Sequence, residues 1–157
     1  MEKTRIGGVI RRTHLAQIDV LSVPDRPGVA AALLKALGDA RINVQFIVQC
    51  IDSENRDHIV VCVDRDDMAE AVALVNQVSP KICAGCIRVN DDVAIVSIFG
   101  PDFRERPGIA GQMFDALASE DINILAISTS ISTVSCVIRH SDLEKANQAL
   151  LRTFELP

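Results

Sequence analysis

The pattern of apolar and polar residues in one part of the chain is repeated 80 positions later. Residues 26–47 align without gaps on residues 106–127, and nine of the 22 aligned positions are identical. In both copies the apolar residues follow the i, i+4, i+5, i+8 spacing of an amphipathic helix. The repeat therefore predicts two units of one fold, in which the same face of this helix is buried. The apolar positions are Val29, Leu33, Leu34 and Leu37 in the first copy and Ile109, Met113, Phe114 and Leu117 in the second.

Strand patterns surround each of these helices, one before it and two after it. A second helix follows, which is expected to start at Asp67 in the first copy and at Ser141 in the second, where Ser141 and Glu144 have capping-box spacing. Each copy therefore shows a β-α-β-β-α pattern, one strand short of the ferredoxin-like βαββαβ plan. The expected strands are residues 16–21, 43–50 and 58–63 in the first copy and 93–98, 123–130 and 134–138 in the second.

The fourth strand of each unit is expected from a segment outside these patterns. Residues 82–89 follow the second helix of the first copy and can complete its sheet. The second copy ends without a further strand pattern, whereas residues 5–11 resemble residues 82–89. We therefore predict an α+β fold of two ferredoxin-like βαββαβ units, with antiparallel sheets and helices on one face. The first unit, residues 14–90, would be inserted into the second, which consists of residues 91–157 and the N-terminal strand 5–11.

The amino-acid composition limits the classes of partner that such a protein can have. Hydrophobic residues make up 48% of the chain, charged residues 24%, and the net charge is -5, which is ordinary for a globular protein. A mildly acidic chain without Trp or Tyr attracts phosphate backbones poorly and has little on which to stack bases. No apolar run reaches the ~20 residues that span a bilayer, and no secretory segment follows the first residues. We expect no nucleic-acid partner, no membrane association and a cytoplasmic location.

Candidate catalytic and metal-binding motifs are weak. Cys50, Cys62 and Cys136 lie in or beside apolar runs, so we expect reduced and mostly buried thiols. Cys83 and Cys86 have CxxC spacing, but no second such motif exists and the three histidines are scattered. No phosphate-binding loop, nucleophile elbow or dinucleotide fingerprint is present. We therefore expect no metal site, no cofactor and no catalytic residue.

The loop of residues 23–30 carries the most suggestive chemistry. It leads from a strand to a helix N-terminus, where free backbone N–H groups suit a carboxylate. Asp25 is placed to hold an ammonium, and Asn43 and Gln49 add neutral hydrogen-bonding groups, so the set describes an α-amino-acid site. The alternative is structural: Pro27 and Gly28 would only shape the turn, with Asp25 capping the helix.

Two asparagines have a structural alternative as well. Asn43 and Asn123 could each simply hold the turn into the following strand. The second copy has a longer loop, residues 100–108, with Glu105 at the position of Asp25, so its equivalent site should differ in shape. An acyl phosphate hydrolase would need an Arg and an Asn at one phosphate loop. Arg26 and Asn43 imitate this only loosely, and the acidic loops argue against that enzyme.

The motifs together resemble the paired ACT domains of aspartokinase, the enzyme that phosphorylates aspartate, over nearly the whole chain. In the first copy the resemblance rests on VPDRPGVAAALLKAL, INVQFIVQ and a strand that starts with Asp57. In the second it rests on VAIVSIFG, RPGIAGQMFDAL, INILAISTS and VSCVI. The resemblance implies feedback regulation by threonine, lysine or both, with the amino acid bound where the first unit of one subunit faces the second unit of another.

The resemblance also implies the residues of the effector site. One chain would contribute the loop and the strand after it, and a second copy would contribute Asn123 and Ile124. Ser128 and Thr129 would lie near an equivalent second pocket. The residues expected from the first chain are Asp25, Pro27, Gly28, Val29, Ala30, Asn43, Val44 and Gln49.

The implied partners are a second copy of the chain and a catalytic aspartokinase subunit. No kinase domain precedes residue 1, so we expect the chain to be a small regulatory subunit, a fragment or a free-standing sensor of another amino acid. Met1 to Lys3 resemble the start of such small subunits. The chain departs from the family pattern at Cys50, where Asn is usual, and at Ile131, where Glu is usual. These departures leave the identity of the effector open.

Overall fold

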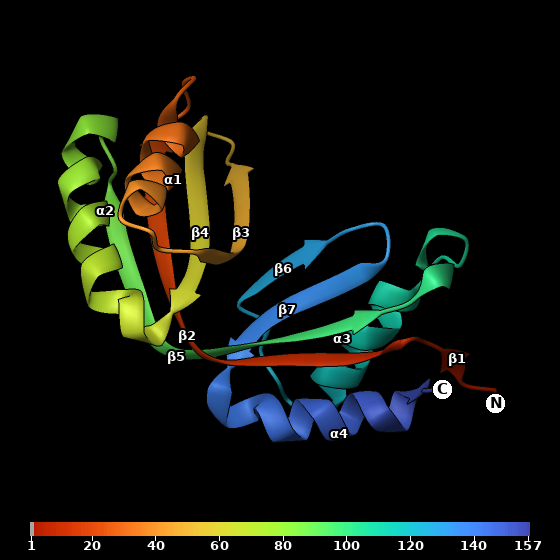
Figure 1. Ribbon diagram of the computed structural model, residues 1–157. Helices are drawn as coiled ribbons and strands as arrows, with labels where there is room; N and C mark the ends of the chain where they lie inside the picture. Colours follow the sequence, from red (N-terminus) through yellow and green to blue (C-terminus); the bar gives the residue numbers. More distant parts are fainter. Residues whose placement is uncertain (1) are drawn as a thin grey trace. The chain divides into compact units, whose positions relative to one another are not determined.

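The computed structural model describes residues 2–157; Met1, the first residue of the expected subunit start, and the side chain of Asp102 lie outside the described residues. The chain divides into two compact units (Figure 1). The first unit is His14–Asp92, and the second joins Met1–Thr13 to Val93–Pro157. Both units have the βαββαβ order with antiparallel strand pairing, which confirms the predicted fold class.

The first unit is a four-stranded sheet with two helices, built from one continuous segment of the chain. Its sheet has the order β3-β4-β2-β5, and the helices α1 and α2 pack against each other. Strand β2 is much longer than expected, and only its part from His14 onward belongs to this unit. The elements are β2 (Gly8–Pro24), α1 (Val29–Asp39), β3 (Val44–Ile51), β4 (Arg56–Asp64), the 3-10 turn η1 (Arg65–Asp67), α2 (Met68–Ile82) and β5 (Cys86–Phe99).

The second unit repeats this plan with the roles of the two long strands exchanged. Its sheet has the order β6-β7-β5-β2, with the early part of β2 as its fourth strand. A short parallel pair, β1 with β8, also joins the two ends of the described chain, and the sequence patterns did not indicate it. The elements are η2 (Pro101–Arg104), α3 (Ile109–Ser119), β6 (Ala126–Thr129), β7 (Thr133–Arg139), η3 (His140–Asp142), α4 (Leu143–Thr153), β1 (Thr4–Arg5) and β8 (Phe154–Glu155).

The repeated helix buries the predicted face in both units. Of the four apolar positions in each copy, three are buried and the fourth, Leu34 or Phe114, is partly buried against the same core. Each unit has its own apolar cluster under its two helices. Helices α1 and α3 each follow a glycine with positive φ, 95° at Gly28 and 91° at Gly108. This backbone conformation favours glycine.

Some predicted boundaries were wrong. Helix α4 starts at Leu143 after a 3-10 turn and has no side-chain cap, so the capping box of Ser141 and Glu144 does not form. Strand β6 is only Ala126–Thr129, so Asn123 lies in the preceding loop, because pairing with β7 begins at Ala126. Among the described residues, no helix is both long enough and apolar enough to cross a bilayer.

The N-terminal segment supplies core to the second unit, which generates a stability prediction. Ile6 is 3% exposed and belongs to the apolar cluster of that unit, and its N–H donates to the carbonyl oxygen of Glu155 at 2.9 Å. Replacing Ile6 with Ala should lower the free energy of unfolding by about 2–5 kcal/mol, measured by denaturant titration. Ile10, which is 41% exposed, is the matched control, and Ile10→Ala should cost less than about 1 kcal/mol.

Hydrogen exchange can show which unit the Ile6→Ala substitution destabilises. Ile6→Ala should weaken amide protection chiefly in the strands between Val93 and Arg139, because Ile6 packs into the core beneath them. Loss of protection concentrated between His14 and Asp92 instead would contradict the assignment of the N-terminal segment to the second unit.

Candidate functional site

The loop between β2 and α1 leaves the start of the helix open. The N-cap residue is Gly28, which has no side chain to offer, and the first turn of α1 contains no acidic residue. The alternative in which Asp25 caps this helix is therefore wrong, because the cap position lies three residues further along. The first N–H groups of a helix have no partner within it, and here they remain available to an anion.

Two polar side chains on the neighbouring strands form a fixed pair. Gln49 of β3 donates from Nε2 to Oδ1 of Asp57, on β4, at 2.7 Å. Asp57 is only 2% exposed. An ionised carboxylate can only accept, so the amide nitrogen of Gln49 must face Asp57, and Oε1 is left as an acceptor. Sequence reasoning did not include Asp57 in the site; its one signal was an acidic residue at the start of a buried strand.

These groups meet in one hollow of the first unit. Its lining includes Asp25, Pro27, Gly28, Val29, Ala30, Gln49 and Asp57. Asp25 is exposed, and its backbone N–H is held by the carbonyl oxygen of Asn55 at 3.2 Å. The guanidinium of Arg26 is bonded instead to the carbonyl oxygen of Lys81 at 2.9 Å. The hollow thus places carboxylate and amide acceptors near open helix N–H groups, which complements a zwitterion.

The other predicted site residues lie elsewhere. Asn43 is exposed in the turn before β3, and Val44 packs against the core of the first unit, so neither is part of the hollow's described lining. In the second unit Asn123 is exposed in the loop before β6, and Ile124 packs against that unit's core. Ser128 and Thr129 lie on β6, paired with Ser135 and Val134 of β7.

The corresponding loop of the second unit has a different lining. It contains η2, and Glu105, at the position of Asp25, is exposed. The hollow beside the start of α3 has both basic and acidic residues in its lining, namely Lys3, Arg5, Arg106, Glu2 and Glu155. The two copies of the loop therefore share a left-handed glycine but differ in the side chains that surround it.

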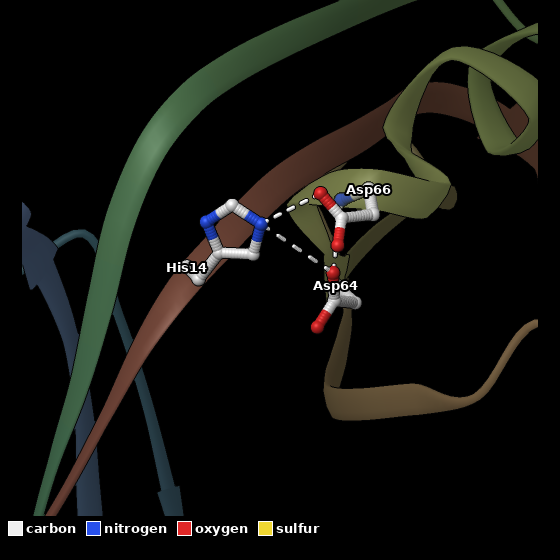
Figure 2. Close-up of side chains that lie close together, drawn as sticks. All are labelled: His14, Asp64 and Asp66. Atoms are coloured by element: carbon white, nitrogen blue, oxygen red, sulfur yellow. Dashed lines mark hydrogen bonds and ion pairs between the residues drawn. The ribbon is translucent and has the colours of Figure 1, made fainter.

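One described group of side chains has the spacing of a metal site. Figure 2 shows His14 pointing toward Asp66 and Asp64, with its Nε2 at 2.8 Å from Asp66 Oδ1 and 3.9 Å from Asp64 Oδ1. All three ligand atoms lie within 4.8 Å of one another. His14 and Asp66 are exposed and Asp64 is half-buried, and the hydrogen bond between His14 and Asp66 accounts for the closeness of these side chains. Residues 14 and 66 are distant in sequence, so no motif indicated this pairing.

The cysteines divide by exposure. Burial raises the pKa of Cys62 and of Cys136 to about 12, so both thiols stay protonated. All five cysteines are free, but Cys50 is exposed, which contradicts the expectation that it is buried. Cys50 lies near the end of β3, an edge strand with only β4 beside it, and its side chain therefore meets solvent.

Comparison with known proteins defines the class. A family model described as ACT domain matches residues 17–79, and a second model described as ACT domain matches residues 96–154. Both units are therefore ACT domains.

Relatives define the family more closely. An aspartokinase of Pseudomonas aeruginosa is 38% identical over 156 residues, which cover 99% of this chain and 38% of that protein. The ligand-free regulatory subunit of aspartate kinase from Thermus thermophilus is 32% identical with a TM-score of 0.88, covering 97% of this chain and 100% of that one. A crystal structure of aspartokinase alpha and beta subunits gives 34% identity and a TM-score of 0.87, with 94% and 97% covered. The chain belongs to the aspartokinase family and corresponds to its regulatory ACT domains, which confirms the resemblance.

The pair of His14 and Asp66 yields a prediction about protonation. The hydrogen bond that His14 Nε2 donates to the Asp66 carboxylate, together with the charge of that carboxylate, raises the pKa of His14 above the ordinary value of 6.5. A nuclear magnetic resonance titration should show this shift in the wild-type protein, and Asp66→Asn should move the midpoint back toward 6.5. Because the folded-state pKa is raised, the pair stabilises the fold below the unfolded pKa, and this contribution is lost as the pH rises through the folded pKa. An unchanged midpoint in Asp66→Asn would refute the assigned cause.

Proposed function

We propose that the chain is an amino-acid sensor that regulates aspartokinase, with threonine, lysine or both as effectors. The observation that carries this proposal is the hollow of the first unit, where Asp25, Gln49 and Asp57 lie with the uncapped start of α1. Carboxylates and the Gln49 Oε1 accept hydrogen bonds from an ammonium, and helix N–H groups donate to a carboxylate. A site for a free α-amino acid needs both kinds of group, acceptors for its ammonium and donors for its carboxylate.

The effector site is proposed to be shared between two copies of the chain. The family resemblance assigns Asn123 and Ile124 of a second copy to the site that Asp25, Ala30 and Gln49 begin. Asn123 is exposed in this chain and is free to reach a neighbouring molecule. Ser128 and Thr129 would belong to a second pocket. The proposed partners are a second copy and a catalytic aspartokinase subunit or domain, in the cytoplasm.

The exposed edges of the sheets support pairing of two copies. Strands β3 and β6 are each paired on one side only; β3 carries two exposed isoleucines, and β6 carries one, with a second exposed isoleucine in the turn that follows it. Ile47 and Ile51 of the first copy correspond in the repeat to Ile127 and Ile131 of the second, with exposures of 39%, 52%, 39% and 70%. Apolar side chains on an open edge are a liability unless another chain covers them. This arrangement favours association through these strands.

Threonine should raise the melting temperature of the isolated chain. A ligand that binds only the folded state at one hundred times its dissociation constant adds about 2.7 kcal/mol, which corresponds to about 5–10 °C for a protein of this size. Asp25→Ala should abolish the shift because it removes a carboxylate for the ammonium. Asp39→Ala, at the far end of α1, is the control and should keep the shift.

Lysine is the second ligand to test, and a thermal-shift screen of all twenty amino acids covers other effectors. A shift by an unrelated amino acid alone would favour a free-standing sensor. The absence of any shift with aspartate-family amino acids, both alone and with a catalytic aspartokinase subunit, would refute the proposed sensing role.

Association is tested by sedimentation. The wild-type chain should sediment as a dimer, and Ile127→Lys should weaken the dimer at least about tenfold because it places a charge on the β6 edge. Leu151→Lys on α4 is the matched control, since Leu151 is 43% exposed and lies away from the edge strands. A wild-type monomer, with and without effector, would contradict the shared site.

A further inference from the structure

We propose that His58 is a positioning residue of the effector site, acting through the bulged segment of β2 that precedes Asp25. The inference rests on the function proposed above and names a residue outside the hollow. Asp57 and His58 are adjacent on β4, so their side chains point to opposite faces of the strand. Asp57 meets the hollow with Gln49, whereas His58 contacts the bulge and the β3–β4 turn.

The bulge is a strained feature that its neighbours must hold in place. The pairing of β2 with β4 shifts register between Val20 and Val23. Ser22, inside the bulge, has a φ of 55°, in the left-handed region that non-glycine residues rarely adopt. Such a conformation persists only where surrounding contacts determine it. One contact comes from Gly85, whose N–H donates to the carbonyl oxygen of Leu21 at 3.0 Å.

His58 supplies the second contact, and it can do so in only one protonation state. The N–H of Ser22 donates to Nδ1 of His58 at 3.2 Å, so Nδ1 carries no proton. On the other side of the ring, Nε2 lies 2.8 Å from Oδ2 of Asp52. The carboxylate accepts, so Nε2 carries the proton. Asp52 therefore selects the tautomer that the bulge requires.

Asp52 is itself held by the turn between β3 and β4. Its Oδ1 accepts from the N–H groups of Glu54 at 2.8 Å and Arg56 at 3.1 Å. The N–H of Asp25 donates to the carbonyl oxygen of Asn55 in the same turn, at 3.2 Å. The segment from Ser22 to Asp25 is thus tied to this turn at both ends. Loss of the His58 contact would release one end and displace the Asp25 carboxylate from the ammonium position.

Conservative variants separate the two hydrogen bonds of His58. Asn places an amide oxygen near the position of Nδ1 and can still accept from Ser22, whereas Gln places its amide near Nε2 and satisfies only Asp52. The test is calorimetric titration of the full chain with threonine and with lysine. We expect His58→Asn to bind the effector within about twofold of wild type. His58→Gln and His58→Ala should each bind about fivefold more weakly, as expected for the loss of one hydrogen bond.

A spectroscopic readout tests the tautomer directly. Nitrogen-15 spectra of the imidazoles should show His58 protonated at Nε2 and unprotonated at Nδ1. Asp52→Asn turns an amide donor toward Nε2, so it should favour the opposite tautomer and weaken effector binding as His58→Gln does. The control is His14→Asn, which removes the other imidazole–aspartate pair of the first unit and should leave effector affinity unchanged.

The outcomes distinguish this inference from the proposed function. If the wild-type chain binds neither threonine nor lysine, the proposed function fails, and the effector role of His58 fails with it. If the wild-type chain binds an effector and the Asn, Gln and Ala variants bind it equally well, only the inference about His58 is overturned. A wild-type spectrum with the proton on Nδ1 would overturn it as well.

Discussion

The structure depends on the placement of β2 and β5 next to each other in the sheet order of both units. In the first unit β5 is the fourth strand beside β2, and in the second unit β2 is the fourth strand beside β5. Glycines allow the close approach in each case: a Cβ at Gly7 would lie 2.8 Å from the ring of Phe99, and one at Gly85 would lie 2.9 Å from Ser22 Cβ. The first unit is therefore completed by the early part of β5, within its own segment His14–Asp92, whereas the second unit is completed by the early part of β2, which precedes the first unit in sequence.

The loop before the first helix has the same backbone conformation at its glycine in both units, but different side chains surround it. Gly28 and Gly108 start their helices in the same conformation. The first unit surrounds its loop with Asp25 and the paired Gln49 and Asp57. The second has side chains of both signs from the N-terminal segment, among them Glu2, Lys3 and Arg5, at the start of α3. The paired Gln49 and Asp57 with Asp25 suit an ammonium group, which is why we propose the first hollow as the effector site.

The sequence was most informative where a pattern was both local and repeated. The helix faces, the turns before the helices and the borrowed N-terminal strand all follow from apolar spacing and strand counting. Where a single residue had to be interpreted alone, the predictions were weaker. Ser141 has capping-box spacing with Glu144 but does not cap a helix. Cys50 looked like a core residue but is exposed, because periodicity cannot tell an edge strand from a central one.

Two units of one βαββαβ fold and the helix faces that they bury could be predicted from the amino-acid sequence, because hydrophobic periodicity is a property of neighbouring residues. Which polar side chains meet depends on contacts between distant parts of the chain, which the sequence patterns do not reveal. Asp57 orients Gln49, and His58 holds the bulge at Ser22. His14 of β2 pairs with Asp66 of η1, 52 residues further along the chain. Such contacts depend on strand register and on a bulge, and a shift of one residue in register would turn each side chain to the opposite face.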